Sequence, residues 1–159
     1  MRTAAEIDVA NRGRSRIWSA VLDLYLRGAP TPLMRFAWRR NTALPFRELL
    51  VAGRRTGRER RLLVSLIQVG ERRFVGHPNG RAAWTDNVAA AGTCTLVDRD
   101  GTAERVRMVE VSNPADRDAV IDATTRLPAP SGWIYRAARK HIRAIGRFFE
   151  VLPATESRS

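Results

Sequence analysis

Cysteine and lysine are almost absent from this chain, which has one of each, Cys94 and Lys140, in 159 residues. A single cysteine excludes an internal disulfide, so the composition is consistent with a reducing compartment. Threonine and β-branched residues surround Cys94 in the segment 93–97, which predicts a strand that holds a buried thiol. We therefore expect a cytoplasmic protein.

Long apolar runs are also missing. The N-terminal segment lacks the apolar stretch of a signal peptide, and arginines interrupt the later apolar segments every few residues. The sequence therefore predicts neither export nor a membrane span.

Several motifs of known chemistry are absent as well. No G-x-G-x-x-G follows a predicted strand and no G-K-[ST] follows the glycines of residues 53–61, which excludes Rossmann and Walker nucleotide sites. His77 and His141 stand apart from any H-E-x-x-H or C-x-x-C spacing, so no metal site is predicted. A triad of Ser65, His77 and Asp86 is disfavoured because no nucleophile-elbow sequence surrounds the serine.

Positive charge is abundant, with a net charge of +12 and a pI near 11.6. Such a field attracts nucleic acid, anionic lipid and phosphorylated ligands alike, so charge alone does not choose among them. No helix-turn-helix, RNP or zinc-finger signature is present, so we expect no specific nucleic-acid partner. Non-specific binding of nucleic acid is kept as an alternative function.

Hydrophobic periodicity predicts an α+β fold. Two amphipathic helices are expected between residues 15 and 40, and a three-stranded antiparallel meander begins at Phe46. The middle strand, 58–69, has few polar residues between 62 and 67, so we place it centrally with both faces covered. The later elements are expected to be helix 82–92, hairpin 93–111, helix 114–127, helix 133–143 and strand 144–153. Six strands with short turns favour a closed or split antiparallel barrel. We take an antiparallel six-stranded split β-barrel with flanking helices as the expected fold.

The strongest local signal is the segment Gly53 to Arg61, GRRTGRERR, in which two glycines permit a tight turn among five arginines. Guanidinium groups pair bidentately with phosphate or carboxylate, and turn amides add an anion-binding nest. This pattern predicts an anion-binding hairpin, and a solvated basic turn is the competing interpretation.

A second signal is the segment His77 to Asn87, HPNGRAAWTDN, which leaves a strand through a glycine turn and enters a helix near Trp84. A backbone that approaches a flat ring, together with an aromatic wall, suits a flavin-like cofactor. Trp84 is equally well explained as a core residue.

These pieces, in this order, resemble the deazaflavin-dependent nitroreductase family of small split barrels. The resemblance rests on the hairpin Ala52 to Arg60, the glycine loop Asn79-Gly80 and the W-x-x-N segment Trp84 to Asn87. It extends to the N-terminal helix pair and to a closing strand that ends in proline, Phe148 to Pro153, and so covers roughly residues 15–153.

The resemblance implies binding of reduced coenzyme F-420 and hydride transfer to a quinone, nitroaromatic or enone. Its phosphate and acidic tail would bind to Arg54, Arg55 and Arg60, and its ring would lie against the loop 77–80 and the Trp84 helix. The implied cofactor-binding residues are Arg54, Arg55, Thr56, Arg60, His77, Pro78, Asn79, Gly80, Ala83, Trp84, Thr85 and Asn87. The cofactor would carry the chemistry, so no catalytic side chain is assigned.

Two further hypotheses stay open. A split barrel could hold FMN, haem or a lipid-like anion without catalysis, with His77 as a candidate axial ligand. Helices 15–40 also combine aromatic residues with arginines, which favours peripheral contact with the inner face of the cell membrane, while capping of the barrel is the competing role.

We expect one domain at 15–153, flexible ends at 1–14 and 154–159, and a monomer or homodimer.

Overall fold

The computed structural model describes residues 16–27, 31–41, 45–80 and 82–154. The ends that we expect to be flexible lie outside the described residues, except for Ala154. In chain order the elements are α2 (Arg16–Arg27), α3 (Thr31–Arg40), β1 (Phe46–Ala52), β2 (Glu59–Ser65), β3 (Ile67–Val69), β4 (Arg72–His77), α4 (Ala83–Ala91), β5 (Thr93–Val97), β6 (Ala103–Glu110), α5 (Pro114–Thr124), α6 (Ser131–Ala137), α7 (Arg139–Ile145) and β7 (Arg147–Pro153).

The strands form one antiparallel sheet with the order β2-β1-β5-β6-β7-β4-β3. Only Leu66 separates β2 from β3, and its N–H donates to the carbonyl of Pro45 at 2.7 Å. One half of this bent segment pairs with β1 and the other half pairs with β4, so the segment joins the two ends of the strand order. The predicted split barrel is confirmed, and seven strands replace six because the segment 58–69 is broken at Leu66.

The central position expected for residues 62–67 is wrong. β2 lies at one end of the strand order and pairs with β1 alone, and Leu62 and Leu63 are only half-buried. The sheet curls so that β2 approaches β4. The apolar run 62–67 is therefore explained by the curl of the barrel, which covers one face of β2. It does not indicate a neighbouring strand on each side.

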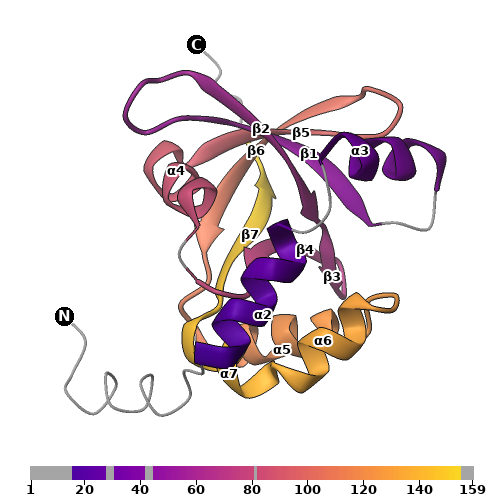
Figure 1. Ribbon diagram of the computed structural model, residues 1–159. Coiled ribbons are helices and arrows are strands. Elements are labelled where there is room, and N and C mark those ends of the chain that lie inside the picture. Colours follow the sequence, from indigo (N-terminus) through magenta and orange to yellow (C-terminus); the bar gives the residue numbers. More distant parts are fainter. Residues whose placement is uncertain (1–15, 28–30, 42–44, 81, 155–159) are drawn as a thin grey trace.

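Two hydrophobic clusters occupy opposite faces of the sheet, because successive side chains of a strand point to opposite faces. The first cluster lies inside the curl and includes Leu49, Leu96 and Phe149. The second lies between the β3-β4-β7 end of the sheet and the helices, and includes Phe74 and Phe148. Figure 1 shows α5, α6 and α7 gathered at this end of the sheet.

The single helix expected at 133–143 is two helices, α6 and α7, which meet at Ala138. Two other helix boundaries follow the sequence signals. Asn113 caps α5 by accepting hydrogen bonds from the N–H groups of Ala115 and Asp116, at 2.9 and 3.3 Å, and Pro114 follows at the first helical position. Gly92 ends α4 in the left-handed conformation, with φ of 68°. Within the described part of the chain, no helix is long and apolar enough to cross a bilayer.

Cys94 lies on β5 as predicted, buried in the first cluster. Burial raises the pKa of its thiol to about 11, because the charged thiolate is poorly solvated there. The thiol is therefore an inert part of the core at neutral pH.

Candidate functional site

The arginine-rich hairpin between β1 and β2 is closed by its own backbone. The N–H of Gly53 donates to the carbonyl of Arg58 at 2.8 Å, and the N–H of Gly57 donates to the carbonyl of Gly53 at 2.7 Å. Gly57 has φ of 67°, which favours glycine. The arginines of the turn are exposed, so the hairpin presents positive charge to solvent.

Arg54 joins this hairpin to α4, the helix of the W-x-x-N segment. Its backbone N–H donates to Asn87 Oδ1 at 3.1 Å, and its Nη1 lies 3.2 Å from Asp86 Oδ2. The structure therefore brings together two segments that lie 33 residues apart in sequence. The contact also commits Arg54 and Asn87, both expected to bind a cofactor, to holding the two segments in place.

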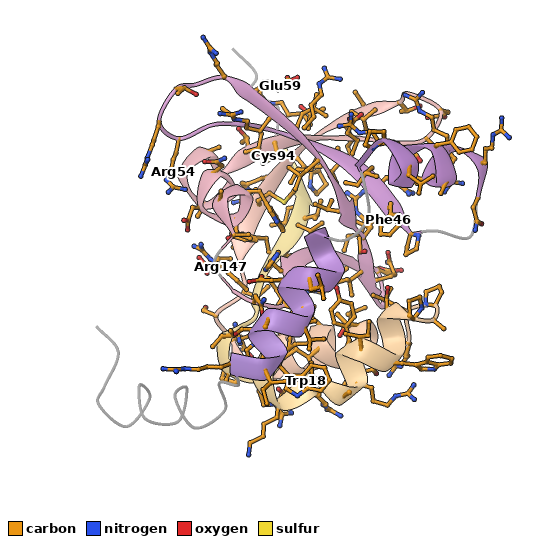
Figure 2. All side chains as sticks on the ribbon, in the orientation of Figure 1. Trp18, Phe46, Arg54, Glu59, Cys94 and Arg147 are labelled. Carbon is orange, nitrogen blue, oxygen red and sulfur yellow. The ribbon has the colours of Figure 1, made fainter. Side chains whose placement is uncertain are left out.

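Asp86 lies between two guanidinium groups, and its importance was missed in the sequence. Arg147 Nη1 lies 2.9 Å from Asp86 Oδ1, and Arg147 Nε lies 2.6 Å from Glu110 Oε1. Arg54 and Arg147, both labelled in Figure 2, thus contact different oxygens of the Asp86 carboxylate. The available signal was an acidic residue in the first turn of a short helix, which alone does not identify its partners.

Asn79 is half-buried and joins the loop after β4 to two helices. Its Nδ2 donates to the carbonyl of Ser19 at 2.9 Å and to Asp23 Oδ1 at 2.8 Å, both on α2. Its Oδ1 therefore accepts, so His141 Nε2 at 2.8 Å is the donor of that bond. His141, on α7, is 1% exposed. The side chain of Asn79 thus ties the loop to α2 and α7.

Gly80 follows in the same loop with φ of 73°. A Cβ atom at this position would lie 2.1 Å from the carbonyl oxygen of Ile145, at the end of α7. The missing side chain of Gly80 therefore lets the loop pack closely against the backbone at the end of α7. Pro78, beside it, is buried.

His77 stands at the other end of this loop and is held in its neutral form. The backbone N–H of Asn79 donates to His77 Nδ1 at 3.2 Å, so Nδ1 carries no proton. Burial lowers the pKa of His77, and the nearby Asp23 carboxylate opposes this shift. At neutral pH the imidazole is therefore uncharged, with its proton on Nε2.

Trp84 and Thr85 begin α4 and differ in exposure. Trp84 is half-buried against the first cluster, and the centroids of its ring and the His77 ring lie 6.4 Å apart at 67°. Thr85 is fully buried, and its hydroxyl donates to the carbonyl of Ala82 at 2.8 Å. Thr85 therefore stabilises the helix start, whereas Ala83 and the exposed part of Trp84 face outward.

Among the residues that the structure describes, no group of three or more His, Cys, Asp or Glu side chains is placed to hold a metal ion.

Comparison with known proteins supports the fold. No protein-family model and no curated protein sequence matches the chain. Among solved structures, one described as a domain-swapped dimer has a TM-score of 0.52 at 14% identity, covering 76% of this chain and 93% of that one. HutZ, the haem storage protein of Vibrio cholerae, has a TM-score of 0.51 at 12% identity, covering 80% and 92%.

A structure described as an F420 reductase has a TM-score of 0.42 at 18% identity, covering 70% of this chain and 88% of that one, which is too low to support an inference. The two structures above 0.5 share only the fold with this chain, at identities well below 25%. The chain is thus a split barrel, and its function has to be argued from its own residues.

Proposed function

We propose that this protein is an oxidoreductase that binds reduced coenzyme F-420 and passes a hydride to a quinone, nitroaromatic or enone. The observation that carries the proposal is the contact of Arg54 with Asp86 and Asn87, which fixes the arginine hairpin beside the helix that starts near Trp84. An anion-binding segment and an aromatic-walled loop thereby belong to one site.

The hairpin suits the anionic part of such a cofactor. Arg55, Arg58 and Arg60 are exposed and form no ion pair with any carboxylate of the described residues. Free guanidinium forks pair strongly with phosphate and carboxylate groups, and both occur in coenzyme F-420. We assign the phosphate to Arg55 and Arg60, with Thr56 and the turn amides beside them, and give Arg54 the role of positioning the hairpin.

The region around His77 and Trp84 suits the planar ring. The exposed side of Trp84 and the small side chain of Ala83 leave a surface that a flat ring can contact, and the Asn79 junction holds the loop behind it. Bound there, the cofactor would supply the hydride. The protein's residues position the two reactants and exclude water, a role that needs no acid–base pair.

Haem is the less favoured occupant because of His77. An imidazole that binds iron through Nε2 carries its remaining proton on Nδ1. Here Nδ1 accepts a hydrogen bond from the backbone N–H of Asn79 at 3.2 Å. A proton on Nδ1 would therefore point at another N–H group, and this hydrogen bond would be lost. Axial ligation would therefore require the loop to rearrange. FMN, which also carries a phosphate, is the closer alternative to coenzyme F-420.

A fluorescence titration of the purified protein with oxidised coenzyme F-420, beside FMN, tests the proposal. We expect saturable binding of F-420, and Arg55→Ala and Arg60→Ala should each weaken it by about 1.5–3 kcal/mol, the usual contribution of a hydrogen bond to a charged group. Arg126→Ala is the matched control, because Arg126 is exposed on a distant turn. Absence of F-420 binding, or equal losses in all three variants, would contradict the assignment.

We further propose that α2 contacts a membrane surface, where lipophilic quinones are dissolved. Ile17 and Leu24 lie on one face of this helix and are 75% and 74% exposed, and Phe36 of α3 is 54% exposed. Arg16, Arg39 and Arg40 are exposed on the same two helices. Trp38, one of the aromatic residues expected to contribute, is buried, and its Nε1 donates to the carbonyl of Phe46 at 2.8 Å.

A further inference from the structure

Half of the outer face of the sheet, the face opposite the first cluster, is not covered by α5, α6 and α7. Those helices pack on the β3-β4-β7 end, where Phe74 and Phe148 join the second cluster. On β2, β1, β5 and β6 the same face carries side chains that alternate with the residues of the first cluster. α3 contacts this face at the start of β1, where Arg35 Nη2 lies 3.1 Å from Glu48 Oε1. The part of the face beyond that contact, toward Ala52 and Thr93, is open to a ligand.

The strand register arranges these side chains in rows. Arg61 pairs with Leu50, Leu50 with Thr95, and Thr95 with Arg105, so these four lie in one line across the sheet. In the next row, Glu59 pairs with Ala52, and Thr93 pairs with Arg107. Short side chains on β1 and β5 are thus flanked by long charged side chains on β2 and β6.

The result is an open hollow of about 320 Å³, which we call the outer trough. Its volume lies within the range of about 300–1,000 Å³ that small-molecule sites occupy. Glu59 and Cys94, labelled in Figure 2, border it. The residues that line it are Leu50, Val51, Ala52, Gly57, Glu59, Thr93, Cys94, Thr95 and Arg105.

The two long walls of the outer trough differ in charge. On β2, Arg61 Nε lies 2.9 Å from Glu59 Oε1, so these two charges compensate each other. On β6, Arg105 and Arg107 form no ion pair with the carboxylates of the described residues. The β6 wall therefore carries the uncompensated charge of Arg105. Arg107 lies next to it on the same face of β6, beyond the lining residues, and each of the two arginines pairs in register with a threonine of β5.

We propose that the outer trough binds a small phosphate monoester, with its phosphate on Arg105, Arg107, Thr93 and Thr95 and its apolar group on Leu50 and Ala52. Two guanidinium groups and two hydroxyls offer more hydrogen-bond donors than the two oxygens of a carboxylate can accept. The three terminal oxygens of a phosphate monoester accept more hydrogen bonds and so suit this set of donors better. Glu59 lies on β2, two strand spacings or about 10 Å from the threonines of β5, and its charge is compensated by Arg61. Its carboxylate therefore repels the phosphate only weakly.

This site is separate from the one assigned to coenzyme F-420. Trp84 packs against the first cluster, on the inner face, whereas the outer trough lies on the opposite face of the same strands. None of the side chains assigned to the cofactor lines the outer trough, although Gly57 of the same turn does. Different variants therefore test the two proposals.

Isothermal titration of the full-length protein with hexyl phosphate tests the proposal, with hexanol, hexanoate and inorganic phosphate as parallel ligands. We expect one molecule of hexyl phosphate to bind per chain, more tightly than inorganic phosphate or hexanoate, and no binding of hexanol. Arg105→Ala should weaken hexyl phosphate binding by about tenfold or more, because a charge-assisted contact is lost. Arg126→Ala, which removes one exposed positive charge elsewhere, should leave the affinity within about twofold.

A substitution that fills the outer trough separates binding there from general attraction to a basic protein. Ala52→Phe leaves the charge unchanged and places a large side chain on the floor, so it should weaken hexyl phosphate while inorganic phosphate binds as before. Far-UV circular dichroism and the midpoint of thermal unfolding identify variants that fold, and Arg105→Gln replaces Arg105→Ala if the latter does not. The proposal is overturned if the wild type shows no saturable binding. It is also overturned if hexanoate binds with the same affinity as hexyl phosphate, or if Arg126→Ala weakens binding as much as Arg105→Ala does. A third contradicting result is an unchanged hexyl phosphate affinity in Ala52→Phe.

Discussion

Among the single residues that the structure describes, Gly80 occupies a position that tolerates little change. It combines a φ of 73° with a carbonyl oxygen of Ile145 that would lie 2.1 Å from any Cβ atom. We expect Gly80→Ala to lower the free energy of unfolding by about 2–5 kcal/mol, the sum of left-handed strain and overpacking. Urea unfolding followed by far-UV circular dichroism measures this change.

Gly57 provides the matched control for that experiment. Its φ of 67° is similar, but no atom lies within 4 Å of the position that a Cβ would take. Gly57→Ala should therefore cost only the strain, about 1–2 kcal/mol. Equal losses for the two variants would show that the nearby Ile145 carbonyl adds no cost to a Cβ atom at position 80.

The same residues show how far a site can be predicted from sequence. The sequence predicts a glycine loop before the helix that contains Trp84. A sequence pattern does not tell whether the space left by the missing side chain of the glycine is taken by a ligand or by another segment of the chain. Here it faces α7, and Asn79 next to it is satisfied by α2 and α7. Contacts between residues 56 to 62 positions apart depend on tertiary packing, which no local pattern specifies.

At the scale of elements, α2 supplies the most exposed apolar surface among the described helices with Ile17 and Leu24. If this surface contacts a membrane, vesicles that contain anionic lipid should carry the full-length protein upward in a flotation gradient. Ile17→Ser combined with Leu24→Ser should lower the bound fraction by about tenfold, because two buried apolar side chains are lost from the bilayer contact.

The control for flotation is Trp133→Ser, which removes a 67% exposed aromatic residue from α6 and should leave binding unchanged. If the α2 double variant floats like the wild type, the membrane proposal fails and the positive charge alone accounts for any binding. High salt separates these cases, since it screens attraction to anionic headgroups more than it weakens apolar contact.

Elements with local signals were predicted well, whereas their neighbours in space were not. The cap at Asn113 and the terminal glycine at Gly92 act through bonds within a few residues, so the sequence identifies α5 and α4. The strand 58–69 looks equally clear, yet its apolar run indicated a central strand. It lies at the end of the strand order because the barrel curls and the chain bends at Leu66. Curvature is a property of the whole sheet and leaves no local signature.

At the scale of the whole molecule, the two hydrophobic clusters are coupled through β7. Phe148 and Phe149 are consecutive, and because strand side chains alternate, one joins the second cluster and the other joins the first. Trp18 packs against the second cluster and Trp84 against the first, so each cluster has its own fluorescent residue. A strand that belongs to both clusters should make them unfold together.

This coupling tests the expectation that residues 15–153 form one domain. The measurement uses a background in which Trp38 and Trp133 are replaced by phenylalanine, because the chain has four tryptophans. In that background Trp18→Phe and Trp84→Phe each leave the other cluster's tryptophan, and we expect fluorescence midpoints in urea that coincide with those from far-UV circular dichroism. Phe148→Leu and Phe149→Leu should each cost about 1–3 kcal/mol and shift the transitions of both reporters equally. Two separate midpoints, or a substitution that moves only the reporter of its own cluster, would mean that the helical layer and the barrel unfold as independent units.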